Sequence, residues 1–284
     1  MSETTTETIL NWHKQDPEQK IGFQGGRYTS PNKLLGFLIA CACTFAFYAV
    51  VLFGAKSWQP TQHIAQIFLE RGPTQYVTTG FFFWALALLW MKARKIKFQQ
   101  KAFNLPIIPS DPSFCLNPET ARTVLHQIHE LVDNSMNFAV LNRMERALSN
   151  MDNMGNTADM TAILKIQAEN DESQVASSYG FIQGLMWAIP VLGFIGTVLG
   201  LGQAIGAFGM TLQQDGDLAG IKESLTFVTG GLSTAFDTTL VALVMALILQ
   251  LLVSLLQGNE SNWLDSCNEY CSRKLAGRLR LRDH

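Results

Sequence analysis

The sequence predicts an all-α protein with four transmembrane helices and a helical cytoplasmic extension. Hydrophobic residues make up 48% of the 284 residues and charged residues only 15%. The apolar residues gather in four long runs, and Lys and Arg cluster at one end of these runs. The formal net charge of −2 argues against nucleic-acid binding, which requires a strongly basic surface.

The four apolar runs have the length of membrane spans, because an α-helix needs about 20 apolar residues to cross ~30 Å of hydrocarbon. The predicted spans cover residues 34–53, 77–91, 185–208 and 227–251. The second run is short for a span unless residues 74–76 belong to it. The first two spans are expected to form an outer, lipid-facing pair, and the last two to line the centre.

The distribution of Lys and Arg predicts the orientation, because these residues are retained on the cytoplasmic side. The flanks of the second and fourth spans are basic, with Lys92, Arg94, Lys95, Lys97 and Lys101 after the second and Arg273, Lys274, Arg278, Arg280 and Arg282 beyond the fourth. The connection 54–73 carries only Lys56 and Arg71, and the connection 209–226 only Lys222. Both termini are therefore predicted to be cytoplasmic.

This topology divides the chain into five segments. They are a cytoplasmic N-terminal segment (1–33), the first helix pair (34–91), a cytoplasmic helical domain (92–184), the second helix pair (185–256) and a basic cytoplasmic tail (257–284).

Within the cytoplasmic domain, two helices are expected after a Pro-rich linker at residues 105–112. Asn117 and Pro118 predict a helix start, with Asn as the cap and Pro in the first position. An apolar stripe continues this helix towards residues 153–156, where Gly155 is expected to end it. A second helix is expected from about Asp159 towards the third span.

The third span is rich in small residues. Gly196 and Gly200 form one GxxxG pair, and Gly202 and Gly206 form another, which favours close helix packing. Pro190 is expected to kink the helix near its cytoplasmic end. At helical spacing, one face carries Pro190, Gly193, Thr197 and Gly200.

The fourth span carries the polar cluster Ser233, Thr234, Asp237 and Thr238 together with Gly230. Polar groups inside hydrocarbon are costly unless they face protein or water, so this cluster is expected to point into the bundle. Counting ~1.5 Å per residue, Thr197 and Thr234 lie ~12 and ~10 Å from the outer side. The two hydroxyls could therefore form one polar patch, with Asp237 a turn deeper.

Two interpretations of these polar residues stay open. Asp237 could accept a proton or help to coordinate a cation, or it could make a structural hydrogen bond between helices. Thr197 and Thr234 could line an ion path, or satisfy their hydroxyls on their own helix backbones. No nucleotide-binding glycine loop, catalytic triad or HExxH motif is present. We therefore expect neither an enzyme nor a bound cofactor or metal. The energy source for any work is expected to be an ion gradient or a partner.

The two core spans resemble a known signature. Residues 189–201 (IPVLGFIGTVLGL) and 232–242 (LSTAFDTTLVA) are similar to the MotA/TolQ/ExbB proton channel family, and residues 142–148 and 169–179 resemble its cytoplasmic lead-in. The resemblance covers about residues 140–255. Four spans fit the MotA type, whereas the last two spans look more like those of ExbB and TolQ.

The resemblance implies a homopentamer in the bacterial inner membrane around a dimer of a single-span partner of the MotB, ExbD or TolR kind. Thr197 and Thr234 would face the partner's essential aspartate, and Pro190 would be the kink proline. Protonation of that aspartate would drive rotation, converting proton-motive force into work. Asp237, with Ser233, Thr238 and Thr239 beside it, could instead favour Na⁺. The alternatives are a non-conducting scaffold packed through its GxxxG faces and, least favoured because Asp237 is a lone carboxylate, an intramembrane enzyme.

Overall fold

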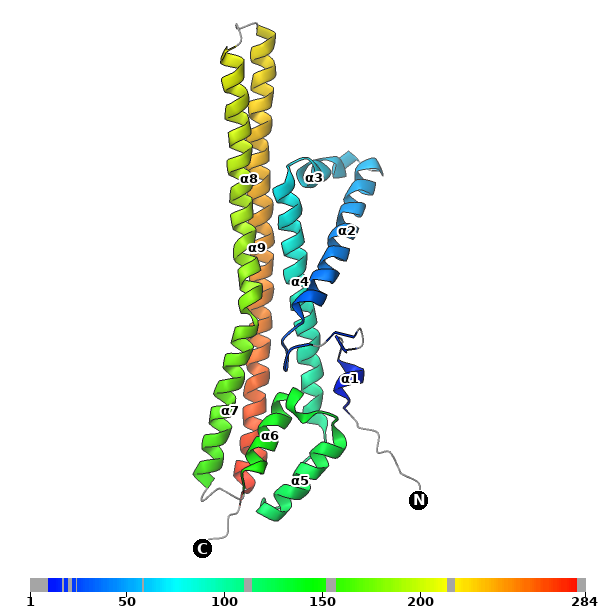
Figure 1. Ribbon diagram of the computed structural model, residues 1–284, viewed down its shortest axis with the longest axis vertical. Coiled ribbons are helices and arrows are strands. Elements are labelled where there is room, and N and C mark those ends of the chain that lie inside the picture. The colour runs from blue at the N-terminus through cyan, green and yellow to red at the C-terminus, as the bar shows by residue number, and fades with distance from the viewer. Residues whose placement is uncertain are drawn as a thin grey trace. The chain divides into compact units, whose positions relative to one another are not determined.

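The computed structural model describes residues 10–16, 18–19, 22–23, 25–57, 59–109, 114–151, 157–213 and 218–279. This part of the chain is mainly helical (Figure 1), with two isolated β-bridges and no strands. The α-helices are α1 (Trp12–Gln15), α2 (Lys33–Ser57), α3 (Gln59–Leu69), α4 (Pro73–Gln100), α5 (Pro118–Leu131), α6 (Ala139–Ser149), α7 (Thr157–Ser178), α8 (Gly180–Gln213) and α9 (Leu218–Lys274). Short 3₁₀ turns are η2 (Lys101–Asn104), η3 (Ser135–Asn137) and η5 (Ala276–Arg278).

Four helical segments are long and apolar enough to cross a membrane, which confirms the predicted fold class. They are Lys33–Gly54, Pro73–Asn104, Ala158–Gly206 and Leu225–Arg278. The second predicted span is lengthened at its start, because α4 begins at Pro73. Pro is favoured in the first helical position, and Gly72 precedes it at φ +91°, a conformation that favours glycine.

The chain divides into two compact units. One comprises Gly36–Leu89 and Phe181–Ser254 and holds the apolar parts of the four long helices; we call it the membrane unit. The other comprises Met1–Leu35, Trp90–Gly180 and Leu255–His284; we call it the polar unit.

In the membrane unit, α2 packs closely on α4. A Cβ at Gly36 would lie 2.6 Å from Leu88 Cδ2, so a larger residue there would require the Leu88 side chain to move. The Phe37 and Trp84 rings meet edge to face at 4.9 Å. Large apolar side chains such as Phe45 and Leu247 are exposed, which suits contact with lipid rather than water.

The polar unit is built around buried ion pairs. Lys92 Nζ lies 3.0 Å from Glu260 Oε1, and both side chains are fully buried. The Tyr179 hydroxyl donates to the same carboxylate at 2.7 Å. Because a buried charge is costly without a partner, this arrangement fixes α4, α9 and the start of α8 to one another.

The N-terminal segment belongs to this core, although its polar sequence predicts only a cytoplasmic lead-in. Lys95 Nζ lies 2.8 Å from Glu18 Oε2, with both side chains buried. The Tyr28 hydroxyl accepts a hydrogen bond from Asn142 Nδ2 at 2.7 Å. Burial, and secondarily the nearby Asp171 carboxylate, raises the pKa of Tyr28 to about 12.

The single helix expected from Asn117 to residues 153–156 is wrong. Its start is confirmed, since Asn117 is the N-cap of α5 and its N–H donates to Thr120 Oγ1 at 2.7 Å. The chain then leaves the helix at Val132, which forms a parallel bridge with Leu10. Asn134 caps the following turn by accepting from Met136 N–H, and α6 begins at Ala139. Local capping and a long-range bridge therefore override the continuous apolar stripe.

The second expected helix begins near its predicted start, at Thr157, but ends at Ser178, and α8 begins at Gly180. The expected break at Gly155, part of the Pro-rich linker (residues 110–112) and the tail residues Arg280 and Arg282 lie outside the described residues.

Candidate ion path

The contact between α8 and α9 in the membrane unit depends on glycines. A Cβ at Gly196 would lie 2.6 Å from Thr238 Oγ1, and one at Gly193 would lie 2.5 Å from Ala242 Cβ. A Cβ at Gly200 would lie 2.8 Å from the Gly231 carbonyl oxygen. The small face predicted on the third span therefore packs against the fourth span of the same chain.

A cluster of hydroxyl and carbonyl groups lies in this contact. The Thr197 and Thr239 hydroxyls hydrogen-bond to each other across the two helices. Thr197 Oγ1 also lies 3.2 Å from the carbonyl oxygens of Gly193 and Ala235, and Thr239 Oγ1 lies 3.2 Å from that of Gly193. We call Thr197, Thr239 and these two carbonyls the hydroxyl cluster.

The structure pairs Thr197 with Thr239 and not with Thr234. The depth estimate counted residues from assumed span ends, but α8 continues to Gln213 and α9 begins at Leu218. The glycine contacts set the register of α8 against α9. In this register Thr197 lies opposite Thr239, which is more than one helical turn after Thr234. Thr234 donates to its own helix at Gly230 O, 3.1 Å away.

Thr234, Ser233 and Asp237 surround a cation that comes from outside the pair. Arg71 Nη2 lies 2.9 Å from Asp237 Oδ2 and donates to Ser233 Oγ at 2.9 Å. Arg71 Nη1 donates to Thr234 Oγ1 at 3.3 Å. The Arg71 and Asp237 side chains are only 17% and 19% exposed. The polar cluster predicted on the fourth span is thus an Arg-binding site.

This ion pair changes the interpretation of Asp237. Arg71 lies in the short connection between α3 and α4, so Asp237 is level with the turn before α4 rather than midway along a span. A guanidinium at hydrogen-bond distance compensates the carboxylate charge and fixes its orientation. The contact supports the structural alternative for Asp237.

The remaining predicted residues have simpler surroundings. Thr238 is buried and donates to its own helix, 3.0 Å from Thr234 O. Pro190 lies inside α8. A Cβ at Gly230 would meet nothing within 4 Å, whereas one at Gly231 would lie 2.7 Å from Gly200 O. The packing glycine of α9 is therefore Gly231, because Gly230 projects about 100° away around the helix.

The structure gives two residues a larger role than the sequence interpretation did, because Thr239 was expected only as a neighbour of Asp237 and Arg71 only as a cation of the connection 54–73. Thr239 adjoins Thr238, and adjacent helix positions face different directions, so one hydroxyl can meet α8 while the other bonds to its own helix. Arg71 carried a usable signal as well. Lys56 and Arg71 are the two cations of the connection 54–73, and such a cation is the natural partner for a lone intramembrane carboxylate.

No cluster suited to a resident metal is present in the described ranges, where no three His, Cys, Asp or Glu side chains converge. The described fold and site define a polytopic helical membrane protein whose last two spans enclose a hydroxyl cluster.

The model of the MotA/TolQ/ExbB proton channel family matches residues 132–268, and over this segment the chain is similar to that family. The match extends from the end of α5 into α9 and includes Thr197, Asp237 and Thr239. It is a family of channels rather than of enzymes. Neither a curated protein nor a solved structure gives a significant match to the chain.

Proposed function

We propose that this chain is the channel subunit of an ion-driven motor in the bacterial inner membrane. It forms, with a single-span partner that bears an aspartate, a proton path that converts proton-motive force into rotation or other mechanical work. A homopentamer around a partner dimer is the assembly that the family resemblance implies. The machine that is driven is left open by this proposal.

The observation that carries the proposal is the hydroxyl cluster within the family-matched segment. A Thr hydroxyl offers one donor and two acceptor lone pairs, so it can hydrogen-bond to a carboxylate or to a carboxylic acid. Thr197 and Thr239 therefore provide groups that suit both protonation states of a partner's aspartate. The Gly193 and Ala235 carbonyls, which lie 3.2 Å from Thr197 Oγ1, add acceptors for the protonated state.

The Arg71–Asp237 pair favours protons over sodium as the coupling ion. A sodium site would need the Asp237 carboxylate and the Ser233 hydroxyl as ligands, but Arg71 occupies both. The guanidinium charge would also repel a metal cation held at the same oxygens. In this proposal Asp237 holds Arg71, and thereby the α3–α4 turn, against α9.

Proton flux into vesicles that contain the chain and its partner tests the ion path. Thr197→Val and Thr239→Val keep the side-chain shape and remove the hydroxyl, so each is expected to reduce flux at least tenfold, the loss of about 1.4 kcal/mol of stabilisation along the path. Thr229→Val is the matched control, because the Thr229 hydroxyl lies 3.0 Å from Leu225 O on its own helix.

Flux in the Thr197 and Thr239 variants equal to that of the Thr229 variant would contradict the proposed path. Repeating the measurement without sodium distinguishes the two coupling ions. Ion flux through a sodium-driven channel would stop, whereas proton flux through the proposed path would continue.

A scaffold remains the second candidate, favoured by the tight glycine packing of Gly193, Gly196 and Gly200. That packing joins helices of one chain, however, and not one chain to another. A scaffold predicts that the vesicles carry no flux above the background of lipid alone, whichever Thr is replaced.

A further inference from the structure

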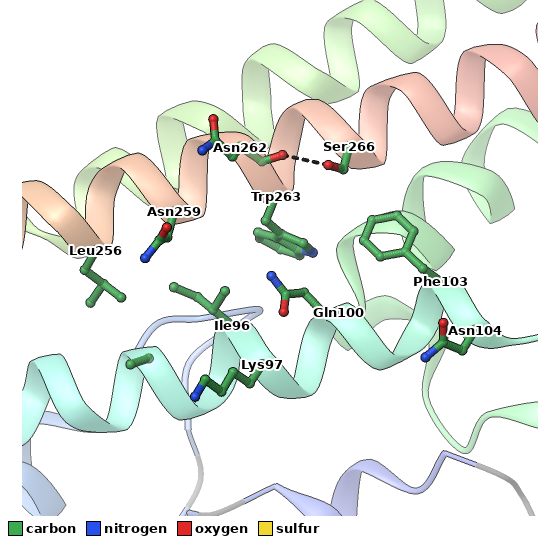
Figure 2. Close-up of a pocket in the computed structure, with 11 residues that line it drawn as sticks. Ile96, Lys97, Gln100, Phe103, Asn104, Leu256, Asn259, Asn262, Trp263 and Ser266 are labelled. Atoms are coloured by element: carbon green, nitrogen blue, oxygen red, sulfur yellow. Dashed lines mark hydrogen bonds between the residues drawn. The ribbon is translucent and has the colours of Figure 1, made fainter.

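A groove in the polar unit has no role in the proposed ion path. It opens between α4 and α9 (Figure 2) and has a volume of about 530 Å³. Its apolar floor includes Trp263 and Phe103, and its polar rim includes Lys97, Gln100, Asn259 and Asn262. Amide groups and one cation on an apolar floor suit a polar protein helix better than an apolar ligand.

One buried donor in the groove lacks an acceptor. The Trp263 side chain is 3% exposed, and its indole N–H has no hydrogen-bond partner. Figure 2 shows the ring in the middle of the groove, beside Gln100 and Phe103. That nitrogen is itself buried, so the ring presents its apolar surface, and not its N–H, to an occupant of the groove.

The buried ion pair gives a common level from which heights can be compared. Lys92 of α4, Glu260 of α9 and Tyr179 at the end of α7 meet at that level. Lys97 lies five residues further along α4, or ~7.5 Å towards the cytoplasmic end. Glu172 lies seven residues back along the antiparallel α7, or ~10.5 Å in the same direction. The two opposite charges therefore lie at nearly the same height.

We propose that the groove binds α7 of a second copy of this chain, with Glu172 of that copy against Lys97. Copies that share one membrane and one orientation are related by rotation about the membrane normal, which preserves height. The α7 face at the height of the groove is exposed and carries Glu169, Glu172, Ser173 and Ala176. It offers carboxylates for Lys97, a hydroxyl that can donate to or accept from the amide groups of the rim, and small residues that allow close approach.

The two surfaces are suited to a ring. They are different surfaces of one chain, because residues of α4 and α9 line the groove, whereas the docking face belongs to α7 (Figure 1). Contact between unlike surfaces is heterologous, and it closes into a cyclic oligomer when the rotation allows. The inference builds on the homo-oligomer of the proposed function and names its cytoplasmic contact.

Disulfide cross-linking of the full chain in isolated membranes tests this contact. A chain with both Lys97→Cys and Glu172→Cys is expected to give a ladder of covalent multimers on oxidation, because each copy bonds to the next. Each single variant, and the unchanged chain with its five native cysteines, sets the background. Lys97→Cys with Lys165→Cys is the matched control, since Lys165 lies on the same α7 face two turns, or ~10.5 Å, further from Glu172.

The inference is overturned if the double variant gives no ladder above the single variants, or if the Lys165 pair cross-links equally well. A dimer from Glu172→Cys alone would show a twofold contact instead. Charge reversal provides a second readout in detergent. Lys97→Glu and Glu172→Lys should each reduce the oligomer fraction, and their combination should restore it.

If the groove holds an anionic lipid, Lys97→Glu will lower copurified lipid phosphate and Glu172→Lys will not rescue it, which also overturns the inference. Failure of the cross-link leaves the proton path untouched, and failure of proton flux leaves the cross-link untouched, so the two proposals fail separately.

Discussion

The Arg71–Asp237 pair is the most consequential single contact in the membrane unit. It joins the turn before α4 to α9, with Arg71 Nη2 2.9 Å from Asp237 Oδ2. The Arg71 guanidinium also donates to the Ser233 and Thr234 hydroxyls. An intramembrane carboxylate is ordinarily a candidate ion carrier, but one held by a guanidinium is already neutralised. Two roles are therefore divided between different residues. The Thr197 and Thr239 hydroxyls serve the proposed ion path, and the Arg71–Asp237 pair holds the turn before α4 against α9.

Replacing Asp237 by Asn tests the structural role. The change leaves Arg71 without a counter-charge in a poorly exposed place, so we expect a loss of about 1.5–3 kcal/mol in the free energy of unfolding. Thermal unfolding in detergent measures it. Arg71→Asp combined with Asp237→Arg should recover part of the loss, as a double-mutant cycle would show. Unchanged stability with abolished flux in Asp237→Asn would instead make Asp237 an ion carrier.

The raised pKa of Tyr28 leads us to expect a lower free energy of unfolding in strong alkali. Its pKa is about 12 in the folded chain, above the ordinary value of 10.0, chiefly because of burial. A raised pKa means that the folded state favours the protonated phenol, so this contribution is complete below pH ~10 and is lost as the pH rises towards ~12. The two pKa values differ by about two, or about 2.7 kcal/mol.

Unfolding of the wild type and of Tyr28→Phe, followed between those pH values, isolates the effect. The wild type should lose more stability than the variant over this interval. Parallel curves for the two proteins would show that Tyr28 does not titrate as described.

At the scale of elements, the α8–α9 contact depends on glycine at defined positions. Gly196→Ala places a methyl group 2.6 Å from Thr238 Oγ1, so the helices must move apart. Overpacking of this kind costs about 1–3 kcal/mol and would disturb the Thr197–Thr239 pair one residue away. Lower thermal stability together with reduced flux is the expected result.

Gly202→Ala is the control for that change. A Cβ at Gly202 meets nothing within 4 Å, and alanine favours helix by about 1 kcal/mol over glycine. This variant should be neutral or more stable. Equal damage from both substitutions would mean that glycine acts through helix flexibility and not through packing.

The elements also show what could be predicted from sequence. Apolar run length located all four spans, and the Asn117-Pro118 dipeptide located the start of α5. The end of α5 could not be predicted, because Val132 leaves the helix to pair with Leu10, 122 positions earlier in the chain. The Thr197 partner was missed for a related reason, since register between two helices depends on contacts and not on counted depth.

At the scale of the whole molecule, sequence reasoning accounts for the class of protein but not for the polar unit. Lys92 and Lys95 predict a positive cytoplasmic flank, yet the structure buries both in ion pairs with Glu260 and Glu18, and it buries Arg143 against Asp171 as well. Charge counts cannot show this, because the partners are distant in sequence. These pairs give the polar unit a folded, ion-paired core.

The central claim is that this chain conducts protons together with an aspartate-bearing, single-span partner. The most direct measurement is proton entry into vesicles under an imposed pH gradient, with the purified complex, with the chain alone, and with a complex whose partner aspartate is replaced by Asn. Flux above the background of lipid alone is expected for the intact complex only. Equal flux in all three preparations, or none in the intact complex, would contradict it.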